Sequence, residues 1–445
     1  MFERLISGGT LVNAEEERKS DLAIANGRIA AILPPGERVE ARRVLDVSGC
    51  LLLPGLVDVH AHLREPGLTH KEDFSSGTHA AALGGVTTIL DMPTDLPWTA
   101  SAEQLAAKMG MASNRIHVDV GFQAVLSRNL DSIAPLLELN PVSLELFTAD
   151  VPEAFLFPTL DAVVELLKCL SGTDTTVGIS PGDESILLGS ARRGSAPDVA
   201  AFLASRPPLA EANGIARAML AAAATGARIH VRQINSKLGV ETWTRLRGLA
   251  DASVETTPQN FFFSSDCYST AHGARLKASP PFRSQEDIAA LRDALRAGLI
   301  DIVATDHAPH TPTEKAASYA AFADIPGGMP GLQTLLQAML KLVDEGVILM
   351  RDVVRVCACN PAERFGLGRR KGRIAPGYDA DILVLDPQQE SVIANAGQVS
   401  KAGYTPFDGW RVKARLRRVF LRGEEIVREG ILVQEAQGQI VVRGG

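Results

Sequence analysis

The sequence predicts an α/β protein, a (β/α)8 barrel joined to a small β-sandwich domain, and three observations lead to this prediction. Short β-rich runs alternate eight times with alanine-rich helical stretches between residues 55 and 306. The two ends of the chain instead carry apolar runs separated by turn residues, the pattern of β-hairpins. The Gly-rich phosphate fingerprint of a doubly wound open sheet, the alternative fold, is absent after the early strands.

The two ends of the chain share the hairpin pattern. Turn signals such as Asn26-Gly27 separate the apolar runs near the N-terminus, which are 5–13, 21–33, 43–49 and 51–55. The same pattern returns after Lys371 in 372–386, 412–430 and 431–434. Because these segments flank the barrel in sequence, we expect one composite β-sandwich domain from residues 1–55 and 372–445, with the barrel at 56–371.

Eight predicted strands define the barrel. They are 55–62, 86–92, 115–122, 142–148, 175–180, 227–234, 252–257 and 299–306. Helical patterns that end near a glycine lie between them, at 75–84, 101–110, 160–170, 211–226 and 284–298. The active sites of such barrels lie at the carboxyl ends of the strands, so the residues that end each run are the informative ones.

The composition excludes several functional classes. Hydrophobic residues make up 46% of the chain, but no apolar run reaches the roughly 18–20 residues of a membrane helix. The net charge of −7, without a basic cluster, argues against nucleic acid. The N-terminus does not resemble a signal peptide, and the five cysteines are scattered without a CxxC pair. We therefore expect a cytoplasmic protein with reduced thiols.

The first strand ends in Asp58-Val59-His60-Ala61-His62. Side chains two apart on a strand point the same way, so His60 and His62 both enter the barrel mouth. The eighth strand ends in Thr305-Asp306, which places a carboxylate beside the first strand when the barrel closes. Two imidazoles and a carboxylate can hold one divalent metal, which lowers the pKa of a bound water. Asp306 can both contact the metal and accept the proton of that water.

The sequences of five segments resemble those of the cyclic amidohydrolases. The similar segments are DVHAHLREPG (58–67), KEDFSSGTHAAALGGVTTILDMP (71–93), PPFRSQEDIAALRDALRAGLIDIVATDHAPHTPTEK (280–315), NPAERFGLGRRKGRIAPGYDADILVLD (360–386) and SKAGYTPFDGW (400–410). Class I dihydroorotase is the nearest type, with allantoinase and hydantoinase behind it. The resemblance runs along nearly the whole chain and implies the same composite fold.

The resemblance implies ring opening of a small cyclic amide by metal-activated water. It assigns His60, His62 and Asp306 to the metal, and it assigns Arg64 and His310 to a carboxylate of the substrate. Allantoinases and hydantoinases lack this arginine. A planar guanidinium is a natural partner for a carboxylate.

Residues on four of the predicted strands depart from the family pattern. Glu145 stands where a carboxylated lysine normally bridges two metals, and Ser180 and Gln233 stand where histidines hold the second one. On strand seven, Gln259 and Asn260 stand where the family has two histidines. His230 lies three residues before Gln233, so strand alternation turns it to the opposite face, and we expect it to pack in the barrel wall.

These departures predict a mononuclear site. The ligands are His60, His62, Asp306 and Glu145, and zinc is the expected metal, with iron and manganese as alternatives. Glu145 has an alternative interpretation as a buried acid that is paired with a neighbouring base.

The expected substrate contacts differ from the pattern as well. Thr94 replaces the asparagine that helps dihydroorotases bind the carboxylate, and Asp95 would repel a carboxylate if it faced the pocket. The segment 327–331 is either a mobile loop over the mouth or an ordinary Gly/Pro-rich turn.

Two hypotheses for function remain. The first is a metal-dependent hydrolase of a small cyclic amide or ureide, dihydroorotate or a related ring, with allantoinase or hydantoinase activity as a variant. The second is a non-catalytic subunit, such as a structural partner of aspartate transcarbamoylase. In either case we expect a homo-oligomer, a dimer or tetramer.

Overall fold

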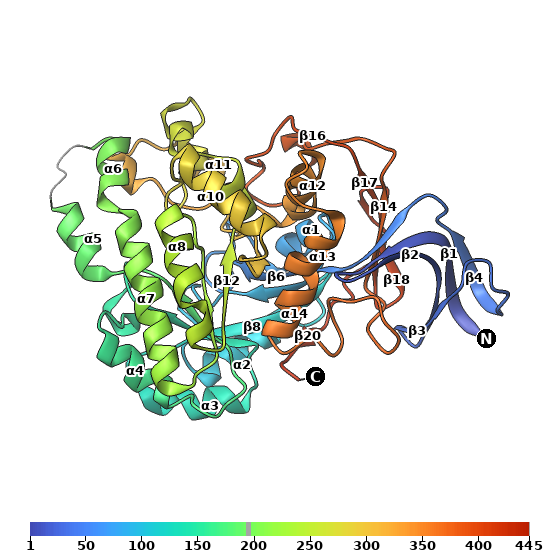
Figure 1. The fold of residues 1–445 in the computed structure, drawn as a ribbon, viewed down its shortest axis with the longest axis horizontal. Coiled ribbons are helices and arrows are strands. Elements are labelled where there is room, and N and C mark those ends of the chain that lie inside the picture. The colour runs from blue at the N-terminus through green and yellow to red at the C-terminus, as the bar shows by residue number, and fades with distance from the viewer. Residues whose placement is uncertain (193–196, 445) are drawn as a thin grey trace.

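The computed structural model describes residues 1–192 and 197–444, and it contains the predicted barrel. Eight parallel strands follow one another around the barrel in chain order (Figure 1). They are β6 (Leu56–Ala61), β7 (Val86–Asp91), β8 (Asp119–Val125), β9 (Ser143–Phe147), β10 (Val177–Ser180), β11 (Ile229–Val231), β12 (Ala252–Thr256) and β13 (Ile302–Val303). All eight overlap the predicted strands, although β8 lies a few residues later than 115–122.

The barrel closes between its first and last strands. A parallel bridge joins Ala61 to His307, and the backbone N–H of His62 donates to the carbonyl of His307 at 2.8 Å. This closure excludes the open-sheet alternative, because an open sheet would leave β6 and β13 as unpaired edges.

Fourteen α-helices are found in the described residues, most of them around the barrel (Figure 1). They are α1 (Phe74–Leu83), α2 (Ala102–Ala112), α3 (Ile133–Glu138), α4 (Leu160–Lys168), α5 (Glu184–Ala191), α6 (Val199–Ser205), α7 (Pro208–Thr225), α8 (Lys237–Leu246), α9 (Gly273–Leu276), α10 (Gln285–Arg296), α11 (Pro312–Ala316), α12 (Leu335–Asp344), α13 (Met350–Val354) and α14 (Asn360–Arg364). Capping boxes from Asp73, Ser101 and Ser284 begin three of them, which satisfies backbone N–H groups that the first turn leaves free.

Both ends of the chain contribute strands to a second sheet. The strands are β1 (Phe2–Val12), β2 (Glu17–Ala25), β3 (Arg28–Leu33), β4 (Ala41–Asp46), β5 (Leu51–Pro54), β14 (Ile382–Asp386), β17 (Arg415–Leu421), β18 (Glu424–Arg428) and β19 (Ile431–Leu432). Antiparallel pairing of β5 with β14 joins the two ends. Asn26 and Gly27, with φ of 53° and 71°, form the predicted tight turn between β2 and β3.

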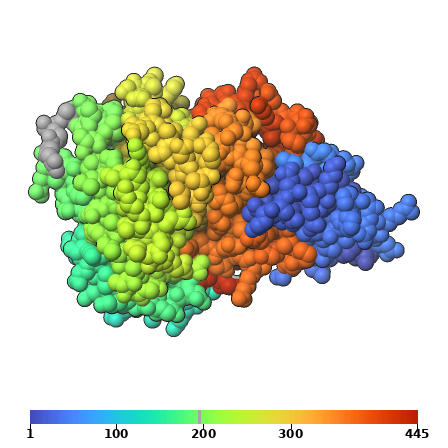
Figure 2. Space-filling model, in the orientation of Figure 1, coloured from blue at the N-terminus to red at the C-terminus, as the bar shows by residue number. Residues whose placement is uncertain are grey.

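The C-terminal tail differs from the expected division. Strand β20 (Ile440–Val441) pairs in parallel with β8 of the barrel and not with the terminal sheet. Within the described residues, β15 (Ser391–Val392) and β16 (Arg411–Val412) form a separate two-stranded sheet. In the space-filling view the N-terminal residues gather at one end of the molecule, beside residues from the C-terminal part (Figure 2). Among the described residues, none of the helices combines the length and apolar character needed to cross a membrane.

The barrel interior is apolar at its base and charged above it. Phe365 and Leu367, which follow α14, pack with Val441 against strand residues such as Val59 and Ile302. On the side toward the mouth, Phe365 contacts the ring of His230 and the guanidinium of Arg232, with separations of 5.3 and 5.4 Å. Apolar side chains therefore fill the base of the barrel, and the polar residues of the interior lie between them and the open mouth.

Candidate metal centre

His60, His62 and Asp306 meet at the carboxyl end of the barrel, as the sequence predicts. The Nε2 atoms of His60 and His62 lie 3.4 and 3.3 Å from the same oxygen, Oδ1 of Asp306. Asp58 supports this juxtaposition, because its carboxylate accepts hydrogen bonds from the backbone N–H groups of His60 and Thr305 at 3.1 Å each. The first and eighth strands are thereby tied together directly below the three side chains.

These three side chains form one wall of a cavity of ≈ 250 Å³. Thr94, Ser180 and Gln233 line the cavity as well, and Phe147, Leu187 and Pro280 contribute apolar surface to it. Gln259 and Asn260 line a smaller adjoining cavity of ≈ 20 Å³. The main cavity is slightly smaller than the roughly 300–1,000 Å³ typical of sites for drug-sized ligands, and it therefore suits a small ring.

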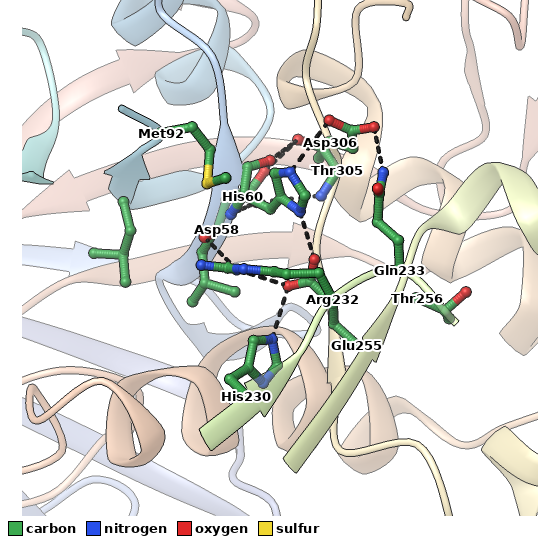
Figure 3. A network of polar contacts seen from close by, with 12 residues as sticks. Asp58, His60, Met92, His230, Arg232, Gln233, Glu255, Thr256, Thr305 and Asp306 are labelled. Atoms are coloured by element: carbon green, nitrogen blue, oxygen red, sulfur yellow. Dashed lines mark hydrogen bonds and ion pairs between the residues drawn. The ribbon is translucent and has the colours of Figure 1, made fainter. Parts of the chain in front are cut away.

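Each candidate ligand is held by a second polar group. The Nδ1 atom of His60 lies 2.5 Å from Glu255 Oε1, and the Nδ1 atom of His62 lies 2.9 Å from the Thr94 hydroxyl. Gln233 donates its side-chain N–H to Oδ2 of Asp306. Figure 3 shows His60 between Asp306 and Glu255, with Gln233 reaching Asp306 from the segment directly after β11. Such partners fix the ring orientation of metal-binding histidines.

The protonation states of His62 and Asp306 suit a cation. Burial opposes protonation of His60, but the carboxylates of Glu255 and Asp306 raise its pKa, so a metal would displace a proton from this ring. Burial lowers the pKa of His62 to about 4, so its imidazole is neutral at pH 7. Burial opposes ionisation of Asp306, but the neighbouring imidazoles of His60 and His62 hold the pKa of its carboxyl below the ordinary value. Two ring nitrogens and an ionised oxygen, with all three ligand atoms within 4.8 Å of one another, are a donor set that zinc accepts.

Glu145 lies outside this group of ligands. Its carboxylate accepts hydrogen bonds from the guanidinium of Arg232 at 2.7 and 3.1 Å, and Ser143 donates to it at 2.9 Å. Both Glu145 and Arg232 are completely buried. The interpretation as a metal ligand therefore gives way to the alternative, a buried acid paired with a neighbouring base, and we leave Glu145 out of the ligand set.

His230 lies inside the barrel and not in its wall, which corrects the expectation from strand alternation. Its Nε2 contacts Glu255 at 2.9 Å, and its Nδ1 contacts the Ser253 hydroxyl at 2.7 Å. The alternation fails because Gln233, directly after β11, has a left-handed backbone with φ of 48°. His230, Arg232 and Gln233 therefore all face inward, and only Gln233 reaches the cavity.

Of the expected carboxylate-binding residues, Thr94 lines the cavity, whereas Arg64 and His310 lie outside its lining. Burial lowers the pKa of Arg64, and within the described residues its guanidinium has no ion-pair partner and its buried Nε no hydrogen-bond partner. His310 has both nitrogens engaged, with Gly327 O at 2.9 Å and Lys71 Nζ at 3.3 Å. Asp95 is buried against Lys108 and does not line the cavity, so it does not face a substrate carboxylate there.

Sequence reasoning missed Arg232 and Glu255, which hold the interior of the site together. The signal was present: each is a charged residue within a short run that otherwise reads as a buried strand, RIHVRQI and ASVETT. Charged residues are almost never fully buried unless they are paired. Two opposite charges on neighbouring barrel strands therefore indicate an interior ion pair.

Comparison with known proteins agrees with this geometry. A model described as "Amidohydrolase family" matches residues 209–426, and one described as "Dihydro-orotase-like" matches residues 49–128. A dihydroorotase of Syntrophus aciditrophicus is 33% identical over 436 residues, covering 96% of this chain and 99% of the relative. The chain belongs to the amidohydrolase family. An allantoinase of Salmonella newport is 34% identical over 438 residues, covering 96% and 95%.

Solved structures of the family share the whole fold. An L-hydantoinase from Arthrobacter aurescens superposes with a TM-score of 0.95 at 28% identity, covering 100% of both chains. A dihydropyrimidinase from Brevibacillus agri has a TM-score of 0.91 at 26% identity, covering 99% of this chain and 98% of the other. The cyclic amidohydrolase resemblance that the motifs indicate is thus confirmed, together with the barrel and the separate β-rich domain.

Proposed function

We propose that this chain hydrolyses a C–N bond of a small cyclic amide or ureide at a single zinc site formed by His60, His62 and Asp306. The observation that carries the proposal is the convergence of two imidazole Nε2 atoms on one oxygen of Asp306, in the wall of a cavity of ring-sized volume. Relatives named dihydroorotase, allantoinase and hydantoinase support the reaction class.

The chain's own residues divide the remaining work. A divalent metal there would polarise the amide carbonyl and lower the pKa of water. Asp306 accepts the proton of the attacking water and returns it to the departing ring nitrogen, and Gln233 holds its second oxygen in place. Thr94 keeps the ring of His62 in a fixed orientation. The apolar wall around Phe147 and Leu187 excludes bulk water from the reacting ring.

The environment of the place where the family resemblance puts a second metal favours a single metal in this chain. Glu145 is bound by Arg232, and the neighbouring Ser180 and Gln233 offer a hydroxyl and an amide in place of imidazoles. The positive charge that would otherwise come from a second metal is already present as a buried guanidinium. A second zinc would need about four ligands of its own.

We further propose that the substrate ring carries a carboxylate that binds Arg64. Arg64 is half-buried, with a buried Nε that has no hydrogen-bond partner and a guanidinium without an ion-pair partner among the described residues. An anionic ligand would offset the cost of this charge. Burial and, after it, the charge of Arg64 lower the pKa of both His62 and His310, so this charge lies near both the proposed metal ligands and the loop that carries His310. Dihydroorotate has this chemistry, and Thr94 and His310 complete the proposed binding set.

The test compares dihydroorotate with dihydrouracil, which has the same ring without the carboxylate, on the zinc-loaded protein and on Arg64→Met. We expect the variant to lose about 10–100-fold in kcat/KM for dihydroorotate only, the equivalent of ~1.5–3 kcal/mol for charged hydrogen bonds. Equal losses on both rings would refute the role of Arg64. Absence of turnover on every cyclic ureide would refute the hydrolase and favour the non-catalytic subunit. The homo-oligomeric state stays a prediction.

A further inference from the structure

We propose that Glu255 is a positioning residue for the metal ligand His60, and that Arg232 and His230 fix Glu255 in that role. The inference rests on the proposed metal site and extends it below the three ligands. Glu255 lies on β12, and its side chain is completely buried in the barrel interior. It does not line the cavity, so it acts through His60 and not on the substrate.

Both oxygens of Glu255 are held. Oε1 lies 2.5 Å from Nδ1 of His60, and Oε2 accepts from His230 Nε2 at 2.9 Å and from Arg232 at 3.0 Å. Because these partners come from β6 and from the β11 segment, the carboxylate cannot rotate without breaking contacts on two sides. Figure 3 shows Glu255 enclosed by the three side chains.

This arrangement determines which nitrogen of His60 faces the mouth. The contact with Glu255 occupies Nδ1, which leaves Nε2, 3.4 Å from Asp306 Oδ1, as the nitrogen that can bind a metal at the mouth. A neutral imidazole that donates from one nitrogen can bind a metal only through the other. The carboxylate also makes the ligating nitrogen more basic.

Arg232 is the centre of the layer that supports Glu255. Its guanidinium contacts Glu145, Glu255, the side-chain oxygen of Gln123 and the backbone carbonyl of Val59. One guanidinium against two carboxylates leaves one negative charge directly beneath His60. That charge is available to stabilise a dication bound by the three ligands above it.

The two histidine ligands are supported by groups of different strength. His60 has an ionised carboxylate behind it, whereas His62 has only the Thr94 hydroxyl. Hydrogen bonds to ionised acceptors are roughly twice as strong as those between neutral groups. We therefore expect the metal to depend more on Glu255 than on Thr94.

The test measures zinc affinity by competition with a chromophoric chelator for wild type, Glu255→Gln, Thr94→Val and Asp301→Asn. Asp301→Asn is a matched control, because Asp301 accepts a hydrogen bond from the N–H of Val254, the neighbour of Glu255 on β12, and its charged neighbours are Arg247, Arg364 and Arg355. We expect 10–100-fold weaker binding in Glu255→Gln, a smaller loss in Thr94→Val, and wild-type affinity in the control. Wild-type affinity in Glu255→Gln would overturn the inference, whereas a wild type that binds no zinc would instead refute the proposed function.

A second measurement does not depend on whether a variant folds. In a crystal structure of the zinc-loaded wild type, anomalous scattering locates the metal relative to the two nitrogens of His60. We expect zinc at about 2.0–2.1 Å from Nε2, with Nδ1 still on Glu255. Coordination through Nδ1, or a broken contact between His60 and Glu255, would overturn the inference.

Discussion

The carboxylate of Glu145 lies 2.7 Å from the guanidinium of Arg232, in the interior of the barrel where neither side chain reaches solvent. Glu145 occupies the position that the family resemblance assigns to a metal-bridging group. In this chain its negative charge is matched by a cation of the chain itself. The carboxylate of Glu145 is therefore neutralised by Arg232, without a bound metal.

Breaking this pair from one side should be more harmful than removing it entirely. We expect Glu145→Leu to lower the free energy of unfolding by about 3–5 kcal/mol, because the buried guanidinium of Arg232 loses two hydrogen bonds that Glu255 alone does not replace. The double variant Glu145→Leu/Arg232→Met should recover a large part of that loss. Urea unfolding of the two single variants and the double variant forms a complete cycle. Additive losses would show that the two charges are not coupled.

Metal content should distinguish one site from two. Protein purified without chelators should contain about one equivalent of metal per chain by elemental analysis, as the ligand set of His60, His62 and Asp306 requires. His60→Ala should lose it, and chelator-treated wild type should regain activity when zinc is supplied. Two equivalents would mean that a second metal binds where the family resemblance puts it, despite Glu145 and Gln233.

Asp306→Asn should abolish turnover without unfolding the chain. The amide cannot accept the proton of the attacking water, and removing a general base typically costs about 10²–10⁴-fold in rate. Circular dichroism and the melting temperature should stay close to wild type, because Asp306 lies at the mouth with its side chain 20% exposed. Wild-type kcat/KM in this variant would refute the assignment.

Acid should remove a stabilising contact at the beginning of α5. Burial opposes ionisation of Asp183, but hydrogen bonds from Ser185, the Ile186 N–H and Arg217 outweigh it and lower the pKa of the carboxyl to about 2, from 3.8. Because the folded pKa is the lower one, the unfolded chain binds more protons between these values, and the stabilisation is lost as the pH falls from about 4 to 2.

Asp183→Asn keeps the helix cap but removes the charge that binds Arg217. We expect the variant to be less stable than wild type by about 1–2 kcal/mol at pH 7, with the difference shrinking below pH 4. Urea unfolding midpoints at pH 7, 5 and 3 test this. A difference that stays constant with pH would show that the charge of Asp183 is not the cause.

Much of the fold was predictable because its signals are local. Alternating strand and helix patterns located all eight barrel strands, and Asn26-Gly27 identified a hairpin turn. The meeting of His60, His62 and Asp306 at the mouth was predictable because these residues end strands, and strand ends of a barrel share one face. The return of β20 to the barrel was not predictable, since a two-residue strand has no pattern of its own.

The interior of the site was less predictable for a physical reason. Side-chain alternation assumes extended backbone, and Gln233 departs from it with φ of 48°, which turns Gln233 inward together with Arg232. Pairing between distant charges, such as Glu145 with Arg232, depends on which strands become neighbours across the barrel. The sequence by itself determined the barrel, the family and the three candidate ligands at the mouth, because these follow from periodicity and motif. Only the tertiary structure decided that Glu145 and Glu255 serve Arg232 and His60, because burial forces every interior charge to bind whatever opposite charge the closed barrel brings within reach.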